Sequence, residues 1–199
     1  MTDARIQGDC DERFTALRDA FAANFEGGEV GAAVAVFLEG RPVVDLWGGF
    51  ADADRTRPWQ RDTIANVYST TKGVVAICAH RLVEEGRLDL DAPVAAYWPE
   101  FAQKGKGEIP VRWLLSHQAG VPAVSTPLEA DALYDWEGIC GALAEQEPLW
   151  EPGTQHGYHA LTFGYLVGEV LRRIDGRSIG RYFREELAEP LGLDFHIGT

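Results

Sequence analysis

The 199-residue sequence lacks any apolar run long enough to span a bilayer, which takes about 20 mostly apolar residues. Its first residues contain neither a basic segment nor an apolar core, so no secretory signal is visible and we expect a cytoplasmic protein. Cysteine is scarce as well: Cys10, Cys78 and Cys140 are widely spaced and form no Cys-x-x-Cys pair. This spacing argues against a disulfide framework and against a structural zinc site.

Basic residues are fewer than acidic residues. Asp and Glu number 31 against 18 Lys and Arg, which gives a formal net charge of -13. Such a charge repels phosphate backbones and anionic lipid headgroups, so we expect neither nucleic acid nor membrane surfaces as partners. Hydrophobic residues make up 46% of the chain, which is enough to bury a core. These properties favour a globular domain, or part of one, that acts on small molecules.

The hydrophobic pattern changes near residue 60. Residues 11–25 carry apolar side chains at helical spacing and predict an amphipathic helix. Residues 31–38 and 42–47 are short apolar runs around a Glu-Gly-Arg turn, which predicts a hairpin of two strands. Residues 61–199 predict a mainly helical region, with helices at 111–116, 133–146, 159–174 and 178–189. The residues after Lys72 are apolar on most sides, so we expect a buried helix there, ended by Gly86.

A lone hairpin is only marginally stable in water and needs further strands or packed helices beside it. The sequence predicts no third strand. The chain also ends on apolar residues, 193–199, without a closing element. We therefore expect the natural polypeptide to continue beyond Thr199 and to supply the missing strands.

The segment Ser69-Thr-Thr-Lys72 combines a hydroxyl and an amine three residues apart, on one face of a helix that begins at Ser69. A serine hydroxyl is a weak nucleophile unless a base adjoins it, and an uncharged lysine amine can act as that base. The first turn of a helix disfavours a cation, and its free N–H groups favour an oxyanion. The spacing therefore predicts nucleophile, base and one oxyanion donor in a single turn.

The alternative interpretation is that Ser69 only caps the helix and Lys72 is a solvated surface lysine. With four Ser and three Lys in the chain, chance alone gives about 0.06 Ser-x-x-Lys matches. Lysine is also rare beside 15 arginines, so a lysine that leads into an apolar helix is an unusual placement. These observations favour catalysis by Ser69 and Lys72.

A second group of residues lies at 150–160, where a Pro-Gly turn and a glycine lead to Tyr158. Tyr158 is able to project its hydroxyl into a pocket; alternatively it is a packed aromatic with its hydroxyl at the surface. His156 and His159 form a His-x-x-His pair, but no acidic or thiol cluster accompanies them. We therefore expect neither a metal nor a cofactor.

Three segments together resemble the serine β-lactamase superfamily, which also contains penicillin-binding carboxypeptidases, and most closely its family VIII carboxylesterases. They are residues 68–73 (Tyr-Ser-Thr-Thr-Lys-Gly), residues 111–122 (Val-Arg-Trp-Leu-Leu-Ser-His-Gln-Ala-Gly-Val-Pro) and residues 150–160, which include Trp-Glu-Pro-Gly-Thr and Gly-Tyr-His-Ala. The resemblance implies an α+β fold, with an antiparallel sheet flanked by helices and a mostly helical region, and an active site between them. It also implies that Ser69 is the nucleophile, Lys72 the partner base and Tyr158 the residue that relays protons to and from the leaving group.

Two departures from the family pattern limit what the resemblance implies. Where β-lactamases have Tyr-x-Asn, this chain has Tyr158-His159-Ala160 and lacks an amide that holds substrate or lysine. That loss weakens the case for lactamase activity and is compatible with an esterase. The family's third motif, a Lys-Thr-Gly-like strand that gives the other oxyanion donor, belongs to a C-terminal segment that these 199 residues do not contain.

The leading hypothesis is a serine hydrolase that cleaves small acyl esters through an acyl-enzyme on Ser69. A rival hypothesis keeps this mechanism but changes the substrate to a β-lactam or a D-amino-acid peptide. A third hypothesis is a non-catalytic binding or assembly module of the same fold. All catalytic versions require the Lys72 amine within hydrogen-bonding distance of the Ser69 hydroxyl, with the Tyr158 phenol nearby.

Overall fold

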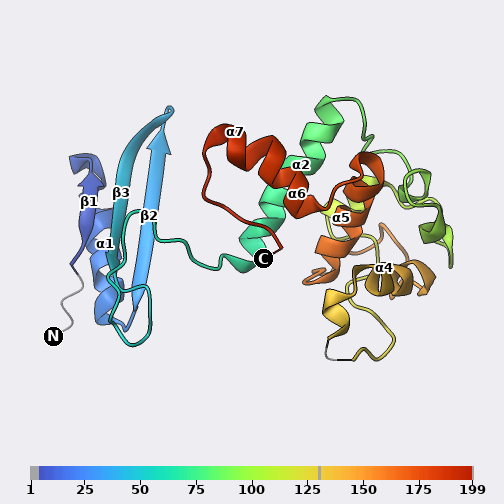
Figure 1. Cartoon of the computed structure of the whole chain (residues 1–199), viewed down its shortest axis with the longest axis horizontal. Helices are drawn as coiled ribbons and strands as arrows, with labels where there is room; N and C mark the ends of the chain where they lie inside the picture. The colour runs from blue at the N-terminus through green and yellow to red at the C-terminus, as the bar shows by residue number, and fades with distance from the viewer. Residues whose placement is uncertain (1–4, 130, 199) are drawn as a thin grey trace. The chain divides into compact units, whose positions relative to one another are not determined.

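The structure is a computed structural model that describes residues 5–129 and 131–198 (Figure 1). The chain divides into two compact units, Met1–Ala65 and Asn66–Thr199. No helix within the described residues is both long and apolar enough to cross a membrane. Cys10, Cys78 and Cys140 are free thiols.

The first unit is a three-stranded antiparallel sheet packed against one helix. Its strands are β1 (Gln7–Cys10), β2 (Gly31–Leu38) and β3 (Arg41–Gly49), in the order β1-β3-β2. The predicted hairpin is β2 and β3, which pair from Gly31 opposite Gly49 to Leu38 opposite Arg41. Its turn places Glu39 at φ 52° and Gly40 at φ 75°, as a two-residue hairpin turn with positive φ at both positions requires.

Helix α1 (Thr15–Glu26), preceded by a 3-10 turn at Glu12–Phe14, covers one face of this sheet. Phe21 and Phe25 of the helix are buried against Val44 and Leu46 of β3. The predicted helix at residues 11–25 is therefore present, and its apolar stripe forms the core of the unit.

Strand β1 is not predicted from the sequence, which indicates only the two strands of the hairpin. Its four residues, Gln-Gly-Asp-Cys, show no alternation of apolar and polar side chains. They become a strand by pairing with β3, from Gln7 opposite Trp47 to Cys10 opposite Val44. Gly8 is required for this approach, because it has φ 99° and a Cβ there would lie 1.9 Å from the Asp45 carbonyl oxygen. Tertiary pairing, rather than local pattern, creates this strand.

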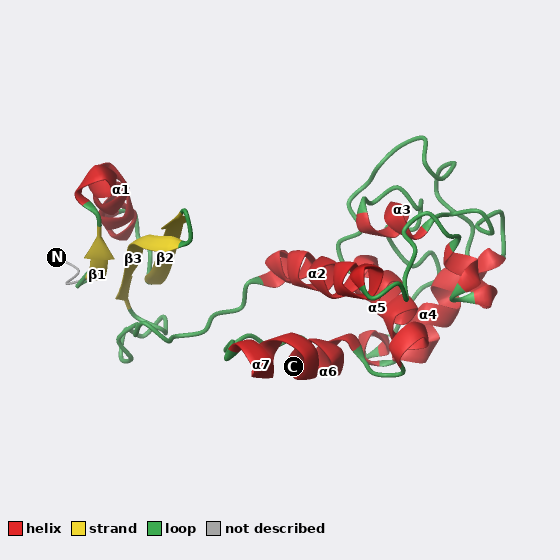
Figure 2. Cartoon of the chain, turned by 90° about the horizontal axis from the view of Figure 1, so that it is seen from above, coloured by secondary structure: helices red, strands yellow, loops and turns green. Residues whose placement is uncertain are grey.

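The second unit is built from helices (Figure 2). Its α-helices are α2 (Thr71–Glu84), α3 (Val111–Leu115), α4 (Trp136–Glu145), α5 (Thr162–Asp175), α6 (Ile179–Phe183) and α7 (Glu189–Leu191). The 3-10 helices are Tyr68–Thr70, Val94–Ala96, Pro99–Ala102 and Ala132–Tyr134, and Arg184–Ala188 is a π-helical turn. Helices α2 and α5 pack against each other and bring segments far apart in the sequence together.

Helix α2 is buried along one face, which corrects the expectation of a helix buried on most sides. The side chains of Val75, Cys78, Ala79 and Leu82 are buried at helical spacing and belong to the main core. Ile77 points away from that face and is 56% exposed. Helix α2 therefore carries more apolar side chains than the core of this unit buries.

A buried lysine joins the loop before α3 to the C-terminal end of α4. Lys106 is 0% exposed, and its Nζ donates to the carbonyl oxygens of Gln103 at 2.9 Å, Ala144 at 3.0 Å and Gln146. Three acceptors satisfy all three ammonium hydrogens, and a cation is favourable at a helix C-terminus. Burial nevertheless lowers the pKa of Lys106, and Lys104 adds to this effect.

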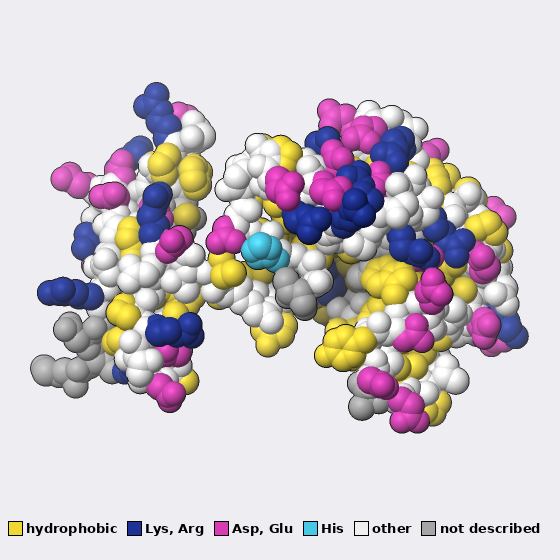
Figure 3. Space-filling model, viewed as in Figure 1, with side chains coloured by type: hydrophobic (Ala, Val, Ile, Leu, Met, Phe, Trp, Pro, Cys, Tyr) yellow, Lys and Arg dark blue, Asp and Glu magenta, His cyan; other side chains and the backbone are white. Residues whose placement is uncertain are grey.

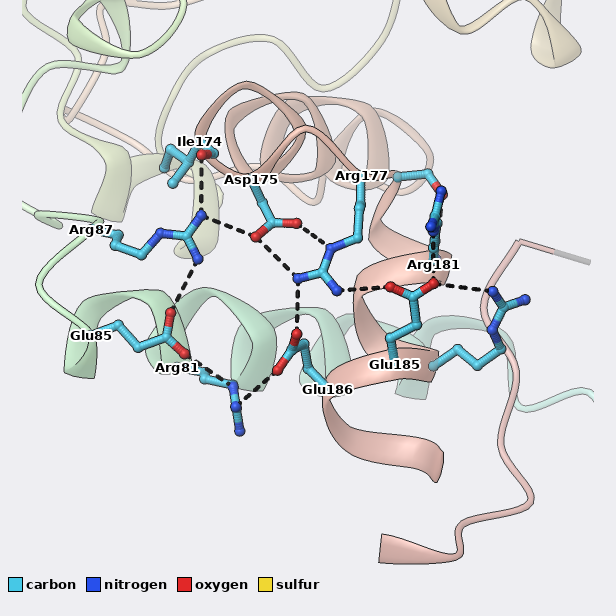
Figure 4. Close-up of polar contacts among 11 residues, drawn as sticks. Arg81, Glu85, Arg87, Ile174, Asp175, Arg177, Arg181, Glu185 and Glu186 are labelled. Carbon is cyan, nitrogen blue, oxygen red and sulfur yellow. Dashed lines mark hydrogen bonds and ion pairs between the residues drawn. The ribbon is translucent and has the colours of Figure 1, made fainter. Parts of the chain in front are cut away.

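Charged side chains connect the C-terminal ends of α2 and α5 to the segment that follows α5 (Figure 4). Arg177 is central: it donates to Asp175, to Glu185 at 2.8 Å and to Glu186 at 2.9 Å. Figure 3 shows Lys and Arg side chains alternating with Asp and Glu side chains on this part of the surface. The network also includes Arg81, Glu85, Arg87 and Arg181, and, through a longer ion pair to Glu185, Arg184.

Candidate active site

Ser69 and Lys72 lie together at the start of α2. Ser69 belongs to the 3-10 turn Tyr68–Thr70, which directly precedes the α-helix, and Lys72 is the second residue of α2. The Lys72 Nζ donates to the Ser69 Oγ at 3.1 Å and to the Ala160 carbonyl oxygen at 2.7 Å. The hydrogen bond that the sequence predicts between amine and hydroxyl is therefore present.

The backbone around Ser69 is held in an unusual conformation. Tyr68 has φ 44°, in the left-handed region, which costs a non-glycine residue about 1–2 kcal/mol. Its N–H donates to Asn66 Oδ1 at 2.9 Å, and the Thr70 N–H donates to the Val67 carbonyl oxygen at 3.1 Å. The Ser69 N–H donates to no acceptor among the residues that the structure describes, so it is free to bind an oxyanion.

Tyr158 lies beside this pair, in the loop before α5, and is 54% exposed. The Lys72 Nζ is 4.9 Å from the centroid of the Tyr158 ring and 5.7 Å from that of Phe163. Hydrogen bonding between the phenol and the Ser69 hydroxyl, followed by that with Lys72, lowers the pKa of Tyr158. All three predicted site residues therefore lie together, although the sequence separates Tyr158 from Lys72 by 86 positions.

His117 holds the segment that carries Tyr158, a role that the sequence analysis misses. Its carbonyl oxygen accepts from the Gly157 N–H at 3.1 Å, and its Nδ1 accepts from the His159 N–H at 3.2 Å. Its ring lies against that of Tyr158, with centroids 5.0 Å apart. Burial, followed by the charges of Lys72 and His156, lowers the pKa of His117 and favours the neutral ring. The only sequence signal was its place in the segment 111–122.

The His-x-x-His pair does not form a metal site. His159 is 0% exposed; its Nε2 accepts from the Val121 N–H at 3.2 Å and its Nδ1 contacts the Gly157 carbonyl oxygen at 2.7 Å. Both ring nitrogens are thus engaged, whereas His156 is exposed. Among residues 5–129 and 131–198, no group of three or more His, Cys, Asp or Glu side chains is placed to hold a metal ion. His159 is a structural residue that fixes the loop around Tyr158.

A cavity of about 460 Å³ opens beside Ser69 and Lys72. Figure 3 shows hydrophobic side chains beside a hollow on the visible face of this unit. Apart from Ser69, Thr71 and Lys72, the lining is aromatic, aliphatic or glycine. It consists of Tyr68, Val75, Leu133, Tyr134, Trp136, Ala160, Leu161, Phe163, Gly164, Tyr165, Ile179, Ile197 and Gly198.

Ala160 stands where the family pattern has an asparagine, and the backbone replaces one function of the missing amide. The Ala160 carbonyl oxygen accepts from Lys72, so the amine keeps a second partner besides Ser69. This contact fixes the Lys72 amine beside the nucleophile. The methyl side chain of Ala160 itself offers no hydrogen bond.

Known proteins are similar to this chain in both sequence and structure. The esterase/β-lactamase LipL of Mycobacterium tuberculosis (strain ATCC 25618 / H37Rv) is 42% identical over 196 residues, which cover 98% of this chain and 45% of LipL. The crystal structure of a penicillin-binding protein homologue from Caulobacter crescentus matches with a TM-score of 0.94 and 48% identity, over 98% of this chain and 53% of that one. The crystal structure of a family VIII carboxylesterase matches with a TM-score of 0.91 and 52% identity, over 98% of this chain and 54% of that one.

These matches confirm the predicted fold class, an antiparallel sheet with helices as in β-lactamases and transpeptidases. The chain spans about half the length of the relatives it matches. A family model described as Beta-lactamase matches residues 11–198, nearly the whole chain. The chain therefore belongs to the Beta-lactamase family.

Proposed function

We propose that this chain carries the acylating residues of a serine hydrolase that cleaves small esters. Ser69 is the nucleophile, Lys72 the base and Tyr158 the group that exchanges protons with the leaving alcohol. The observation that carries the proposal is the 3.1 Å contact between the Lys72 Nζ and the Ser69 Oγ at the mouth of an apolar cavity. The names of the relatives, an esterase/β-lactamase and a carboxylesterase, support the same reaction class.

Acylation begins when the Ser69 Oγ attacks the ester carbonyl carbon and its proton passes to the uncharged Lys72 amine. The resulting oxyanion lies against the free Ser69 N–H. The bond between the carbonyl carbon and the alcohol oxygen then breaks, and the alcohol leaves with the Tyr158 phenol proton. Lys72 returns its proton to Tyr158, which leaves an acyl-enzyme on Ser69. The lowered pKa of Tyr158 supports this exchange, because the phenolate forms more readily.

Deacylation uses the same groups in reverse. Water attacks the acyl carbon, its proton passes to the Tyr158–Lys72 pair, and the Ser69 oxygen leaves with that proton. The products are the carboxylic acid and the free enzyme. No cofactor or metal takes part in this sequence of steps.

A fluorophosphonate probe tests the proposal on the full-length protein. We expect labelling of the wild type and none of Ser69→Ala, together with turnover of p-nitrophenyl acetate by the wild type alone. Ser116→Ala is the matched control: Ser116 is exposed, donates to the Arg112 carbonyl oxygen and lies outside the cavity. An unlabelled but folded wild type, or equal labelling of Ser69→Ala, would overturn the proposal and favour a binding module.

A β-lactam is the second candidate substrate, since the name of LipL joins esterase and β-lactamase. The same Ser69 chemistry opens a lactam ring if the amide of the substrate is held. Ala160 provides no side-chain partner for that amide, so we expect esters to be cleaved faster. A kcat/KM for nitrocefin that exceeds that for p-nitrophenyl acetate would reverse this preference.

A further inference from the structure

Two aromatic rings of the cavity lining, called the aromatic wall below, are held in place by contacts within the protein. The rings of Trp136 and Tyr165 pack with centroids 5.1 Å apart, and both line the cavity. The Tyr165 hydroxyl donates to the Leu133 carbonyl oxygen at 2.7 Å, which ties the ring to the segment at the rim. Because both rings have partners within the protein, the wall is preformed rather than created by a ligand.

Residues of helix α5 also hold the Trp136 side chain in place. Its Nε1 donates to Glu169 Oε2 at 2.8 Å, and Glu169 is itself held by Arg172. Gly168 of α5 gives the indole its place, because a Cβ at position 168 would lie 2.7 Å from the Trp136 ring. This support from α5 determines where the aromatic wall stands.

One part of the cavity lining is a glycine, which leaves open the space that a side chain would fill. Gly164 lines the cavity from the first turn of α5, and a Cβ at this position would meet nothing within 4 Å. Its backbone is helical, so another residue fits there without strain, and helices favour almost any residue over glycine. The glycine therefore adds depth beside Ser69 at a small cost to helix stability.

The proposed mechanism assigns the cavity to the acyl side of the attacked bond. Tyr158 delivers the proton to the departing alcohol, so the alcohol faces Tyr158, which is not part of the cavity lining. Ser69 and Lys72 do line it. The other part of the ester, the acyl group, must then point toward Trp136 and Tyr165. The lining that the structure describes contains no Asp, Glu or Arg side chain, and its Lys72 amine is engaged by Ser69 and Ala160.

We propose that this cavity binds an uncharged acyl group bearing an aromatic ring, and that Gly164 sets the depth available to it. The inference rests on the proposed ester hydrolysis and names the substrate class for that site. A volume of about 460 Å³ exceeds what an acetyl group fills and lies in the usual range of small-molecule pockets. Aromatic rings gain attraction from aromatic walls beyond the burial of their surface.

The test measures the ratio of kcat/KM for p-nitrophenyl phenylacetate to that for p-nitrophenyl acetate, each divided by the rate of hydroxide hydrolysis. In the full-length wild type we expect a ratio of about 10 or more. In Gly164→Leu the leucine side chain occupies part of the cavity, so the ratio should fall at least about tenfold. Gly141→Leu is the matched control: Gly141 lies within helix α4, a Cβ there also meets nothing within 4 Å, and it is outside the cavity.

A second variant tests the rim without risk to the core. Tyr134 lines the cavity but is 91% exposed, so Tyr134→Ala removes an aromatic surface while the fold remains. We expect the ratio to fall in this variant too. An unchanged ratio in both Gly164→Leu and Tyr134→Ala, or a wild-type ratio near 1, would overturn the acyl-pocket proposal. Loss of Ser69 labelling in the wild type would instead overturn the ester hydrolase itself.

Discussion

At the scale of single residues, replacement of Lys72 tests whether this residue is the base. Lys72→Arg keeps a hydrogen-bond donor beside Ser69 but removes the base, because a guanidinium is not deprotonated in proteins. We expect kcat for p-nitrophenyl acetate to fall about 10²–10⁴-fold, the usual range for loss of a general base. Lys104→Arg is the control, since Lys104 is exposed and its nearest carboxylate, Glu147, is 3.7 Å away. A Lys72→Arg enzyme with wild-type kcat would show that Lys72 is not the base.

His117 is the second residue whose replacement is informative. His117→Phe keeps a ring against Tyr158 but removes the Nδ1 that accepts from the His159 N–H. It also places a bulky residue at φ 62°, whereas asparagine tolerates this conformation and offers an acceptor. We expect kcat to fall about tenfold in His117→Phe, with KM little changed, because the Tyr158 phenol is misplaced.

The loss should be smaller in His117→Asn, measured by steady-state kinetics and by the rate of fluorophosphonate labelling. A greater loss in His117→Asn than in His117→Phe would mean that ring stacking, and not the hydrogen bond, positions Tyr158. The titratable groups that face His117 are Lys72, His156 and His159, so all measurements are compared at one pH above 6.5, where the neutral ring predominates.

At the scale of elements, the Arg177 network tests how firmly α5 is tied to the helices that follow it. Arg177→Met leaves Asp175, Glu185 and Glu186 without their common partner. Because the Asp175 side chain is almost fully buried, we expect the free energy of unfolding to fall by about 2 kcal/mol in urea titrations of the full-length protein. Arg184→Met is the control: its ion pairs are longer and exposed, so its effect should stay within about 0.5 kcal/mol.

The elements that the sequence predicts are those with a strong local pattern. Strands β2 and β3 alternate around a Glu-Gly turn, and α1 and α5 carry apolar stripes at helical spacing. Strand β1 escaped prediction because only its partner β3 makes it a strand. The predicted helix at residues 159–174 begins three residues later, at Thr162, because hydrogen bonds to His117 hold residues 157 and 159 in a loop.

For the site, motif spacing predicted Ser69 and Lys72, and the family resemblance implied Tyr158; the structure brings the three residues together. Their catalytic roles stay a prediction until they are measured. His117 and the aromatic wall lay beyond sequence reasoning, because neither has a characteristic spacing from Ser69. Gly164 illustrates the reason: a glycine in a helical pattern shows that a side chain is absent, but not which cavity the absence enlarges.

At the scale of the whole molecule, acid stability depends on carboxylates whose pKa is depressed in the folded state. Glu169 is 1% exposed; burial raises its pKa, but hydrogen bonds from Arg172, Trp136 and Arg173 outweigh this and lower it to about 2, from 4.5. The folded state therefore binds the proton less readily than the unfolded state. The stability that Glu169 contributes is complete above pH 4.5 and is lost as the pH falls toward 2.

Glu169→Gln cannot form the same ion pairs at any pH, so it isolates this contribution. We expect the variant to be less stable than the wild type at pH 7, by on the order of 3 kcal/mol. The difference in free energy of unfolding between variant and wild type should narrow as the pH is lowered from 5 toward 2, because the unfolded wild type then binds a proton that the folded state does not. Urea unfolding of the full-length protein at a series of pH values measures both quantities. A difference in free energy of unfolding that is independent of pH would show that the charge of Glu169 contributes little to stability.

The burial of Lys106 has a consequence for how the molecule responds to amine-acylating reagents. Of the three lysines, Lys104 is exposed, whereas the Lys106 ammonium is enclosed and all its hydrogens are taken by carbonyl oxygens. A reagent such as acetic anhydride can reach Lys106 only when the loop at residues 103–106 separates from the end of α4. Pulse acylation followed by mass spectrometry thus turns Lys106 into a built-in reporter of local opening, with Lys104 two residues away as its always-accessible reference.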